Sequence, residues 1–176
     1  MAVKIEGMEV LQANIQKLTN QVVPKAAAKA INKVARSAIK NGTRTVSKDI
    51  HVPAKLIRKR TRLSQKATAS RPVAKIRVDG RNLPLIRLLE NSRRTMRANR
   101  GKIRIGNHQI QRGFIQTLAN GRKHVMQRRG KERYPIDVVK IPLFKPLTTA
   151  FHSELKDYSG RIKVELTREL SNIFKK

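Results

Sequence analysis

The start of the chain places apolar side chains at helical spacing. Steps of three, four, three and four residues separate the members of this stripe, so they share one face of a helix. Its members are Met8, Leu11, Ile15, Leu18 and Val22. A second helix is expected to begin near Pro24, because proline is favoured at a first helical position, and to stop at Asn41-Gly42.

The second helix would carry two stripes of different character. Its apolar positions are Ala27, Ile31, Val34, Ala35 and Ala38. Its basic positions are Lys25, Lys29, Lys33, Arg36 and Lys40. At about 100° per residue the two stripes lie almost opposite each other. The basic stripe therefore has two interpretations, a solvated outer face or a ridge that faces an anionic partner.

Short elements are expected in the middle of the chain. Ala54–Arg60 predicts a short basic helix entered at Pro53. Between Ala74 and Val78, apolar and charged residues alternate, which is the pattern of a half-buried strand, and Asp79-Gly80 marks a turn after it. Gly106-Asn107, flanked by isoleucines, predicts a hairpin.

The rest of the middle region alternates ordered segments with basic ones. Phe114–Leu118 predicts an ordered element, and Val138–Ile141 predicts a strand that ends at Pro142. Asn91–Lys102 and Gln127–Arg133 contain almost no apolar residues. We therefore expect these two segments to be exposed basic loops.

The C-terminal part predicts one long helix. Its apolar residues step by four, three, four, four, four and three, close to the helical period. They are Phe151, Leu155, Tyr158, Ile162, Leu166, Leu170 and Ile173. This phase continues across Ser159-Gly160, although Gly160 weakens a helix by about 1 kcal/mol relative to alanine.

Together these elements predict an α+β fold in one domain of residues 1–176. Residues 1–50 would supply two helices, residues 51–142 a small, mostly antiparallel sheet with basic loops, and residues 143–176 the long helix. Aromatic residues make up only 3% of the 176 residues, so the core must rest on Leu, Ile, Val and Ala.

Charge changes this picture most. The chain has 41 Lys and Arg against 11 Asp and Glu, a net charge of +30. Residues 51–140 alone carry 25 basic and four acidic residues, so the ends are closer to ordinary proteins than the middle. Because like charges repel within a compact domain, an anionic partner is expected, and nucleic acid is the obvious one.

Several classes of protein are not expected. The chain has no cysteine, which excludes disulfides and thiolate metal sites. Its N-terminus lacks the pattern of a signal peptide, and its apolar runs are far shorter than the roughly 18–20 residues of a membrane span. We therefore expect a soluble protein made in a cytoplasm, with no membrane partner.

Residues for catalysis are also sparse. The histidines, His51, His108, His124 and His152, are scattered and do not form a zinc-helix motif. An RNA-cleaving pair of histidines is chemically allowed, but a surface or packing role is the simpler interpretation. Asp79, Glu90, Glu132 and Asp137 lie in basic surroundings that favour ion pairs. The sequence therefore predicts no enzyme, no metal and no cofactor.

The basic segments are the remaining candidate site. Their cations would contact either phosphates or acidic surfaces of protein partners, because the planar arginine fork fits both. Without a helix-turn-helix or a stacking platform, any contact with DNA should be to the backbone. The candidates are Arg93, Arg94, Arg97, Arg100, Arg122, Lys123, Arg128, Arg129, Lys131 and Arg133.

Several segments resemble one family. IEGMEVLQANIQKL and VVPKAAAKAINKVARSAI resemble the opening of the minor tail protein Z family of phage lambda and its relatives. Within residues 113–151, the segments GFIQ, HVMQR and YPIDVVKIP follow in the family's order. The resemblance covers nearly the whole chain, more loosely over residues 64–112.

This resemblance implies a structural role in a virion. The protein would complete the tail at its head-proximal end, with other tail and neck proteins as partners, after assembly in the host cytoplasm. A homo-oligomeric ring is implied, of open stoichiometry with a hexamer as one option, and its basic loops would line or face a channel that holds double-stranded DNA. YPIDVVKIP would be a core strand or an interface, and Phe144 and Phe151 would pack in the core or between subunits.

Two other functions remain open. The net charge alone favours a general, sequence-independent nucleic-acid-binding protein, which would coat DNA as monomers or dimers. A basic RNase would instead lose its cleavage of RNA when one histidine is replaced by alanine.

Overall fold

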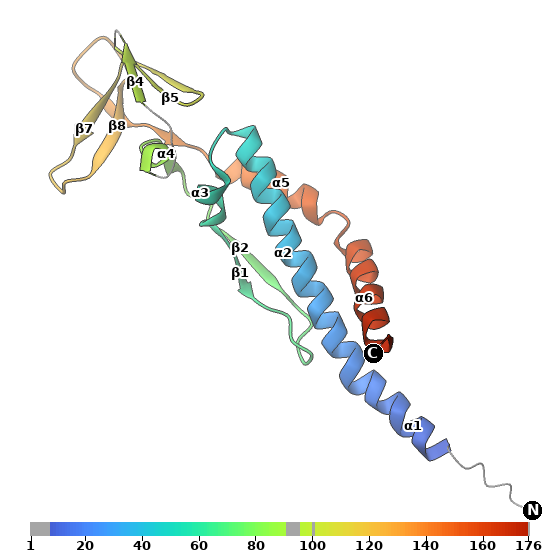
Figure 1. Ribbon diagram of the computed structural model, residues 1–176. Coiled ribbons are helices and arrows are strands. Elements are labelled where there is room, and N and C mark those ends of the chain that lie inside the picture. Colours follow the sequence, from blue (N-terminus) through green and yellow to red (C-terminus); the bar gives the residue numbers. More distant parts are fainter. Residues whose placement is uncertain (1–7, 91–95, 100, 176) are drawn as a thin grey trace, which may run out of the picture. The chain divides into compact units, whose positions relative to one another are not determined.

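The computed structural model describes residues 8–90, 96–99 and 101–175 (Figure 1). Helices at both ends of the sequence and short strands between them confirm the α+β class. The chain divides into two compact units. We call Met1–Lys40, Arg62–Arg77 and Glu154–Lys176 the helical unit, and Asn41–Thr61 and Val78–Ser153 the sheet unit. That the chain forms one domain stays a prediction.

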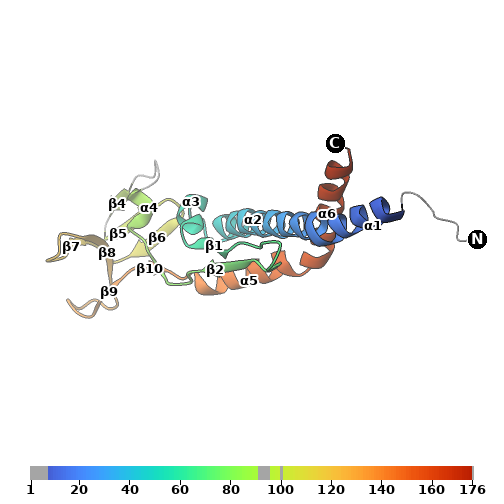
Figure 2. The ribbon, with the colours of Figure 1, turned by 90° about the horizontal axis from the view of Figure 1, so that it is seen from below.

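The described residues begin with one helical run, where two helices were expected. Helix α1 (Met8–Lys17), one π-helical turn η1 (Leu18–Val22) and α2 (Val23–Asp49) follow each other directly (Figure 2). Pro24 has no N–H to donate, and the widened turn just before it lets the Val23 N–H bond to the Leu18 carbonyl. The helix therefore passes the proline.

The expected stop at Asn41-Gly42 is wrong, because α2 continues to Asp49. Gly42 is buried against the ring of Phe151, where a Cβ would come within 3.3 Å of a ring carbon. The glycine therefore serves the close approach of a helix to an aromatic ring and does not end the helix.

In the helical unit, α2 packs with a strand pair and with helix α6 (Tyr158–Phe174). Strand β1 (Thr61–Gln65) pairs with β2 (Lys75–Val78), which confirms the predicted strand. The Asn32 side chain holds the segment between these strands, donating to the Ala67 carbonyl at 2.8 Å and accepting from the Ala67 N–H at 2.9 Å. Lys33 of α2 pairs with Glu165 of α6 at 2.6 Å.

The core of the helical unit consists mostly of small residues. Among the described residues of this unit, seven apolar ones are buried; six are alanines and the other is Val34. They are Ala26, Ala28, Ala30, Val34, Ala35, Ala38 and Ala67. Larger residues such as Ile31, Ile162 and Leu166 are only half-buried. The helices therefore approach each other closely but cover little of their larger apolar side chains.

The sheet unit holds the remaining elements. After α2 come α3 (Ala54–Arg58), which confirms the short basic helix, and later α4 (Arg87–Glu90) and α5 (Phe144–Leu155). The strands form small antiparallel sheets rather than one. In chain order they are β3 (Leu83–Pro84), β4 (Met96–Asn99), β5 (Lys102–Ile105), β6 (His108–Gln111), β7 (Gly113–Thr117), β8 (Lys123–Arg128), β9 (Ile136–Val138) and β10 (Lys140–Ile141).

The sheet unit contains the large apolar core. Strand β3 pairs with β10, while β4–β5–β6 and β7–β8–β9 form two three-stranded sheets. Of the residues described in the two units, nine large side chains of the sheet unit are less than 2% exposed, and none of the helical unit is. They are Val46, Val52, Ile57, Leu85, Leu88, Ile105, Val125, Leu143 and Leu147. The prediction of a core of Leu, Ile, Val and Ala is confirmed.

The two predicted basic loops are partly wrong. Met96–Asn99 forms β4, which pairs with β5, and Gln127 and Arg128 belong to β8. The backbone needs no apolar side chains for these ladder hydrogen bonds, so composition alone missed the strands. The hairpin at Gly106-Asn107 is confirmed between β5 and β6, with Gly106 at a φ of 58°.

The prediction of one long C-terminal helix is also wrong. Helix α5 ends at Leu155 and α6 begins at Tyr158, before the glycine that was considered as a weak point. The carbonyls in the last turn of a helix lack backbone N–H donors. At this break the guanidinium of Arg161 supplies one, donating to the Glu154 carbonyl at 2.9 Å. The same guanidinium donates to Ser37 of α2 at 3.1 Å, so it also holds α6 against α2.

Candidate functional site

The candidate basic residues are not all described. Arg93, Arg94 and Arg100 lie outside the described residues. Arg97 belongs to the backbone of β4, but its side chain is not described. The other six candidates all lie in or beside β8 of the sheet unit.

These six residues form two groups at opposite ends of β8. Arg122 and Lys123 lie where β8 begins, beside the turn from β7. Arg128 ends the strand, and Arg129, Lys131 and Arg133 follow in the connection to β9. Five steps along a strand span about 17 Å, so the two groups cannot meet the same phosphate. These six candidates therefore form two separate groups.

Arg129 is neutralised within the fold. Its guanidinium donates to both carboxylate oxygens of Asp137 on β9, through Nε to Oδ2 and through Nη2 to Oδ1 at 3.1 Å. This hydrogen bonding lowers the pKa of Asp137 and raises the pKa of Arg129. The pair confirms the expected ion pairing of Asp137, and it gives Arg129 a partner inside the chain.

Arg128 supports the following connection. Its guanidinium lies over the Phe114 ring at 5.1 Å from the ring centre, and it donates to the Arg133 carbonyl at 2.8 Å. Register explains the first contact, because Phe114 lies opposite Met126, two residues before Arg128 on the same face. Arg128 therefore orders the β8–β9 connection and is less available to an external anion.

The remaining four cations are exposed. Arg122, Lys123, Lys131 and Arg133 have no carboxylate partner among the described residues. The Arg133 guanidinium lies 5.8 Å from the centre of the Tyr134 ring, which is itself 64% exposed. These four side chains are the part of the candidate site that is available to an anion.

Three charged residues that were not in the candidate set form a further cluster. The carboxylate of Asp79 accepts from Arg81 Nη2 at 2.8 Å and from Arg60 Nη1 at 3.4 Å. Hydrogen bonding from the Arg81 side chain holds the pKa of Asp79 well below its ordinary range. Asp79 was expected to form ion pairs from its basic surroundings, which is confirmed, but only the fold identifies its partners.

The basic residues are divided between the two units differently from their division along the sequence. Arg62–Arg77, which the sequence places in the basic middle, belongs to the helical unit with its five basic residues. On the outer face of α2, Lys25, Lys29 and Arg36 are exposed, whereas the exposed Lys33 is paired with Glu165. The excess of positive charge is therefore shared by both units.

The two phenylalanines have different environments. Phe151 is buried, as expected for core packing. Phe144 is 71% exposed and contacts the backbone at Gly80. In YPIDVVKIP, Ile141 is buried while Ile136 and Val138 are half-buried, so the segment forms two short strands at the margin of the core.

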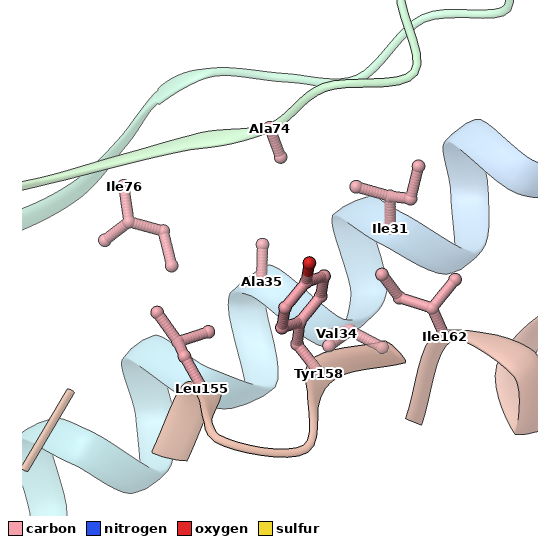
Figure 3. Close-up of a pocket in the computed structure, with 8 residues that line it drawn as sticks. All are labelled: Ile31, Val34, Ala35, Ala74, Ile76, Leu155, Tyr158 and Ile162. Atoms are coloured by element: carbon pink, nitrogen blue, oxygen red, sulfur yellow. The ribbon is translucent and has the colours of Figure 1, made fainter. Parts of the chain in front are cut away.

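An apolar pocket of about 380 Å³ lies in the helical unit (Figure 3). Side chains of α2, β2, the residue before β2, the end of α5 and the start of α6 line it, and the Tyr158 hydroxyl is their one polar group (Figure 3). The lining residues are Ile31, Val34, Ala35, Ala74, Ile76, Leu155, Tyr158 and Ile162. Such a pocket can hold an apolar side chain, but it offers no pair of acid and base groups.

Metal-ligating groups do not cluster in the described ranges. No three His, Asp or Glu side chains lie close enough there to hold a metal ion. His108 lies on β6, His124 on β8 and His152 on α5, each in a different element. Among the helices described, none has the length and apolar content needed to cross a bilayer.

Comparison with known proteins matches the chain along almost its full length. The sequence family described as prophage minor tail protein Z (GPZ) matches residues 5–176. The chain is similar to the tail completion protein of Escherichia phage N15, at 46% identity over 86% of this chain and 85% of that one. It is also similar to tail completion protein Z of Escherichia phage lambda, at 43% identity over 86% of each. No solved structure matches. The chain therefore belongs to the prophage minor tail protein Z family.

Proposed function

We propose that this protein is a structural subunit that completes a phage tail at its head-proximal end and helps to join tail to head. The observation that carries this proposal is its similarity, over 86% of the chain, to two proteins named tail completion proteins. The match includes segments of both units, so it supports a role for the whole chain. In this role the protein is a component of the virion, assembled in the host cytoplasm.

The partners in this role are other tail and neck proteins, together with further copies of the chain in a ring. A ring presents the same surface several times around an axis, which suits the junction of a tubular tail. The number of copies is left open, with six as one option. No catalytic step, metal or cofactor forms part of the proposal, and that the protein is not an enzyme stays a prediction.

The exposed cations are the surface through which this subunit would contact an anionic partner. We assign Arg122, Lys123, Lys131 and Arg133 to contacts with the backbone of double-stranded DNA, with acidic protein surfaces as the alternative partner. Such contacts do not depend on sequence and release counterions from the phosphates. Arg93, Arg94, Arg97 and Arg100 remain proposed members of the same surface, and Arg128 and Arg129 support it from within the fold.

A matched pair of variants tests this role. In the first variant Arg122, Lys123 and Lys131 become glutamine. In the control Lys25, Lys29 and Arg36 of α2 become glutamine, which removes the same charge from exposed positions elsewhere. Each variant is supplied to a lysate that lacks the endogenous subunit, and infectious particles are counted.

The first variant should lower the yield about tenfold, the effect of losing about 1.4 kcal/mol of interaction, while the control stays near wild type. Circular dichroism should show both variants folded. Equal losses in the two variants would show that total charge and not this surface matters. If neither variant nor wild type restores particles, the proposed role itself is wrong.

The alternative is a general nucleic-acid-binding protein, which the net charge of +30 favours. Native mass, measured by light scattering with and without double-stranded DNA at two salt concentrations, separates the two functions. A discrete oligomer that persists at high salt supports the ring-forming subunit. A monomer that changes only with DNA and at low salt supports the general binder. Each lost phosphate contact should also reduce the salt slope by about 0.9.

A further inference from the structure

The N-terminal helical run has an uncovered apolar stripe. Ile15 is 52% exposed, and Leu18 and Val22 are half-buried. None of the described side chains from Asn14 to Val22 is buried. Apolar side chains gain free energy when they leave water, so a stripe of this kind favours a partner.

The rest of the helical unit also exposes large apolar side chains. Ten large apolar side chains of the described residues are exposed, and seven of them belong to this unit. Those seven are Ile15, Val23, Val73, Tyr158, Val164, Ile173 and Phe174. The fully buried residues of the same unit are mostly alanines. The sheet unit, by contrast, buries nine large side chains almost completely. An apolar interface is therefore expected on the helical unit.

The spacing of the stripe specifies a helical partner. Its steps of three, four, three and four residues form a strict heptad seam, which is narrower than the apolar face of a helix packed in a core. In heptad terms Met8, Ile15 and Val22 occupy the a positions, and Leu11 and Leu18 occupy the d positions. β-Branched residues at a with leucine at d favour two parallel strands.

The π turn does not interrupt this seam with a polar residue. The turn extends from Leu18 to Val22, and Val23 follows it directly with 39% of its surface exposed. Because Val22 and Val23 are both apolar and accessible, an apolar side chain remains available where the helix changes its register. The stripe thus extends over about two heptads.

Charge identifies the partner as a second copy. Residues 1–23 contain two lysines and two acidic residues, a net charge of zero in a chain of +30. The positions that flank the seam are uncharged, since they are Gln12, Asn14, Thr19 and Gln21. Two copies of so basic a protein repel each other over most of their surface. This segment is where they can approach without opposing like charges.

We propose that α1 and η1 of one copy pair in parallel with the same segment of a second copy, through Ile15, Leu18 and Val22. This inference rests on the self-assembly in the proposed function and names the surface that carries it. A parallel pair of this kind is isologous and joins two copies, so a ring of more copies needs a second, different contact between such pairs. The basic surface around β8 then stays available to the anionic partner.

Single cysteines test the pairing directly, because the chain has none of its own. A disulfide needs Cα atoms about 4.4–6.8 Å apart, and a parallel seam brings Ile15 opposite its own copy. Ile15→Cys should therefore form a covalent dimer under mild oxidation. The matched control is Gln16→Cys, one residue along the same exposed helix and turned by about 100°.

Leu18→Cys determines the direction of the pair. In a parallel pair it should cross-link as readily as Ile15→Cys. An antiparallel pair centred on Ile15 would cross-link through Ile15→Cys alone, which would overturn the parallel arrangement. Equal and slow oxidation of the Ile15, Gln16 and Leu18 variants would overturn the seam itself.

The last part of the test measures self-association from the native mass of wild type and variants. Ile15→Asp should weaken self-association about tenfold or more, and Gln16→Asp, with the same added charge, should stay close to wild type. Because the seam is uncharged, wild-type association should survive high salt. If wild type is monomeric without cross-links and Ile15→Asp still abolishes tail completion, a different tail protein occupies the stripe and the second copy is refuted. That outcome leaves the proposed function intact, whereas loss of completion by wild type refutes the function and not the seam.

Discussion

Asn32 gives the sharpest stability prediction, because one side chain makes both bonds to a distant backbone. Its amide donates to the Ala67 carbonyl at 2.8 Å and accepts from the Ala67 N–H at 2.9 Å. Ala67 is buried, so neither backbone group can turn to water when the amide is lost. These two bonds fix the segment between β1 and β2 on α2, and that segment and β2 supply Ala74 and Ile76 to the apolar pocket.

The expected magnitude follows from the two bonds. A hydrogen bond contributes about 1 kcal/mol net, and more when its loss leaves a buried group unpaired, so Asn32→Ala should cost about 2 kcal/mol or more. For a chain of this size that corresponds to a fall in melting temperature of about 4–8 °C. Asn32→Asp keeps the shape and the acceptor but turns a carboxylate oxygen towards the Ala67 carbonyl. At neutral pH it should therefore cost at least as much as Asn32→Ala.

Acid should rescue Asn32→Asp selectively. A carboxylate against a carbonyl has a raised pKa in the folded state, so the folded variant binds a proton that the unfolded chain releases. Its stability relative to wild type is then largest at low pH and is lost as pH rises through the folded pKa. The assay is thermal unfolding by circular dichroism at pH 7 and pH 4, at equal ionic strength. A gap between wild type and Asn32→Asp that is the same at both values would refute the paired geometry, with Asn32→Ala as the control that cannot titrate.

Two further predictions concern packing and pH. Leu147→Ala removes a side chain that is 1% exposed and should cost about 2–5 kcal/mol in chemical unfolding. Leu166→Ala should cost clearly less, because α6 has no fully buried residue, and an equal cost would contradict this account of the core. Hydrogen bonding from Lys33 lowers the pKa of Glu165, so the pair stabilises the fold at neutral pH. This contribution is lost as pH falls from the ordinary carboxyl pKa through the lowered pKa of Glu165. Glu165→Gln should therefore flatten the acid side of a plot of melting temperature against pH, and an unchanged slope would show that the pair contributes nothing.

Periodicity predicted the type of most elements but not where the helices end. The apolar steps of the C-terminal region are regular from Phe151 to Ile173, yet Tyr158 within them is 56% exposed. In the sequence the apolar steps continue without interruption across the break between α5 and α6, so counting apolar positions cannot detect it. What stabilises the break is the bond from Arg161 to the Glu154 carbonyl, and an arginine seven residues away carries no sign of this role in the sequence.

The predicted end of the N-terminal helix was wrong because a glycine has more than one role in a helix. Local preference treats Gly42 as a helix stop, but a glycine also permits an aromatic ring to approach a helix. Only the position of Phe151, more than a hundred residues later, distinguishes the two roles. Tertiary packing of this kind overrides a local preference worth about 1 kcal/mol.

In the candidate site, the sequence likewise does not show which basic residues are available to a partner. In the segment from Arg128 to Arg133 the basic residues are equivalent by composition, and a sequence cannot rank them. The register of β8 with β9 ranks them, because it places Gln127 opposite Asp137 and so brings Arg129 to that carboxylate. Lys131 lies beyond the paired strands and keeps its charge exposed. Neutralising Arg129 should therefore loosen this connection, whereas neutralising Lys131 should weaken anion binding and leave the fold unchanged. The functional weight of each arginine or lysine thus depends on whether strand pairing has already given it a carboxylate.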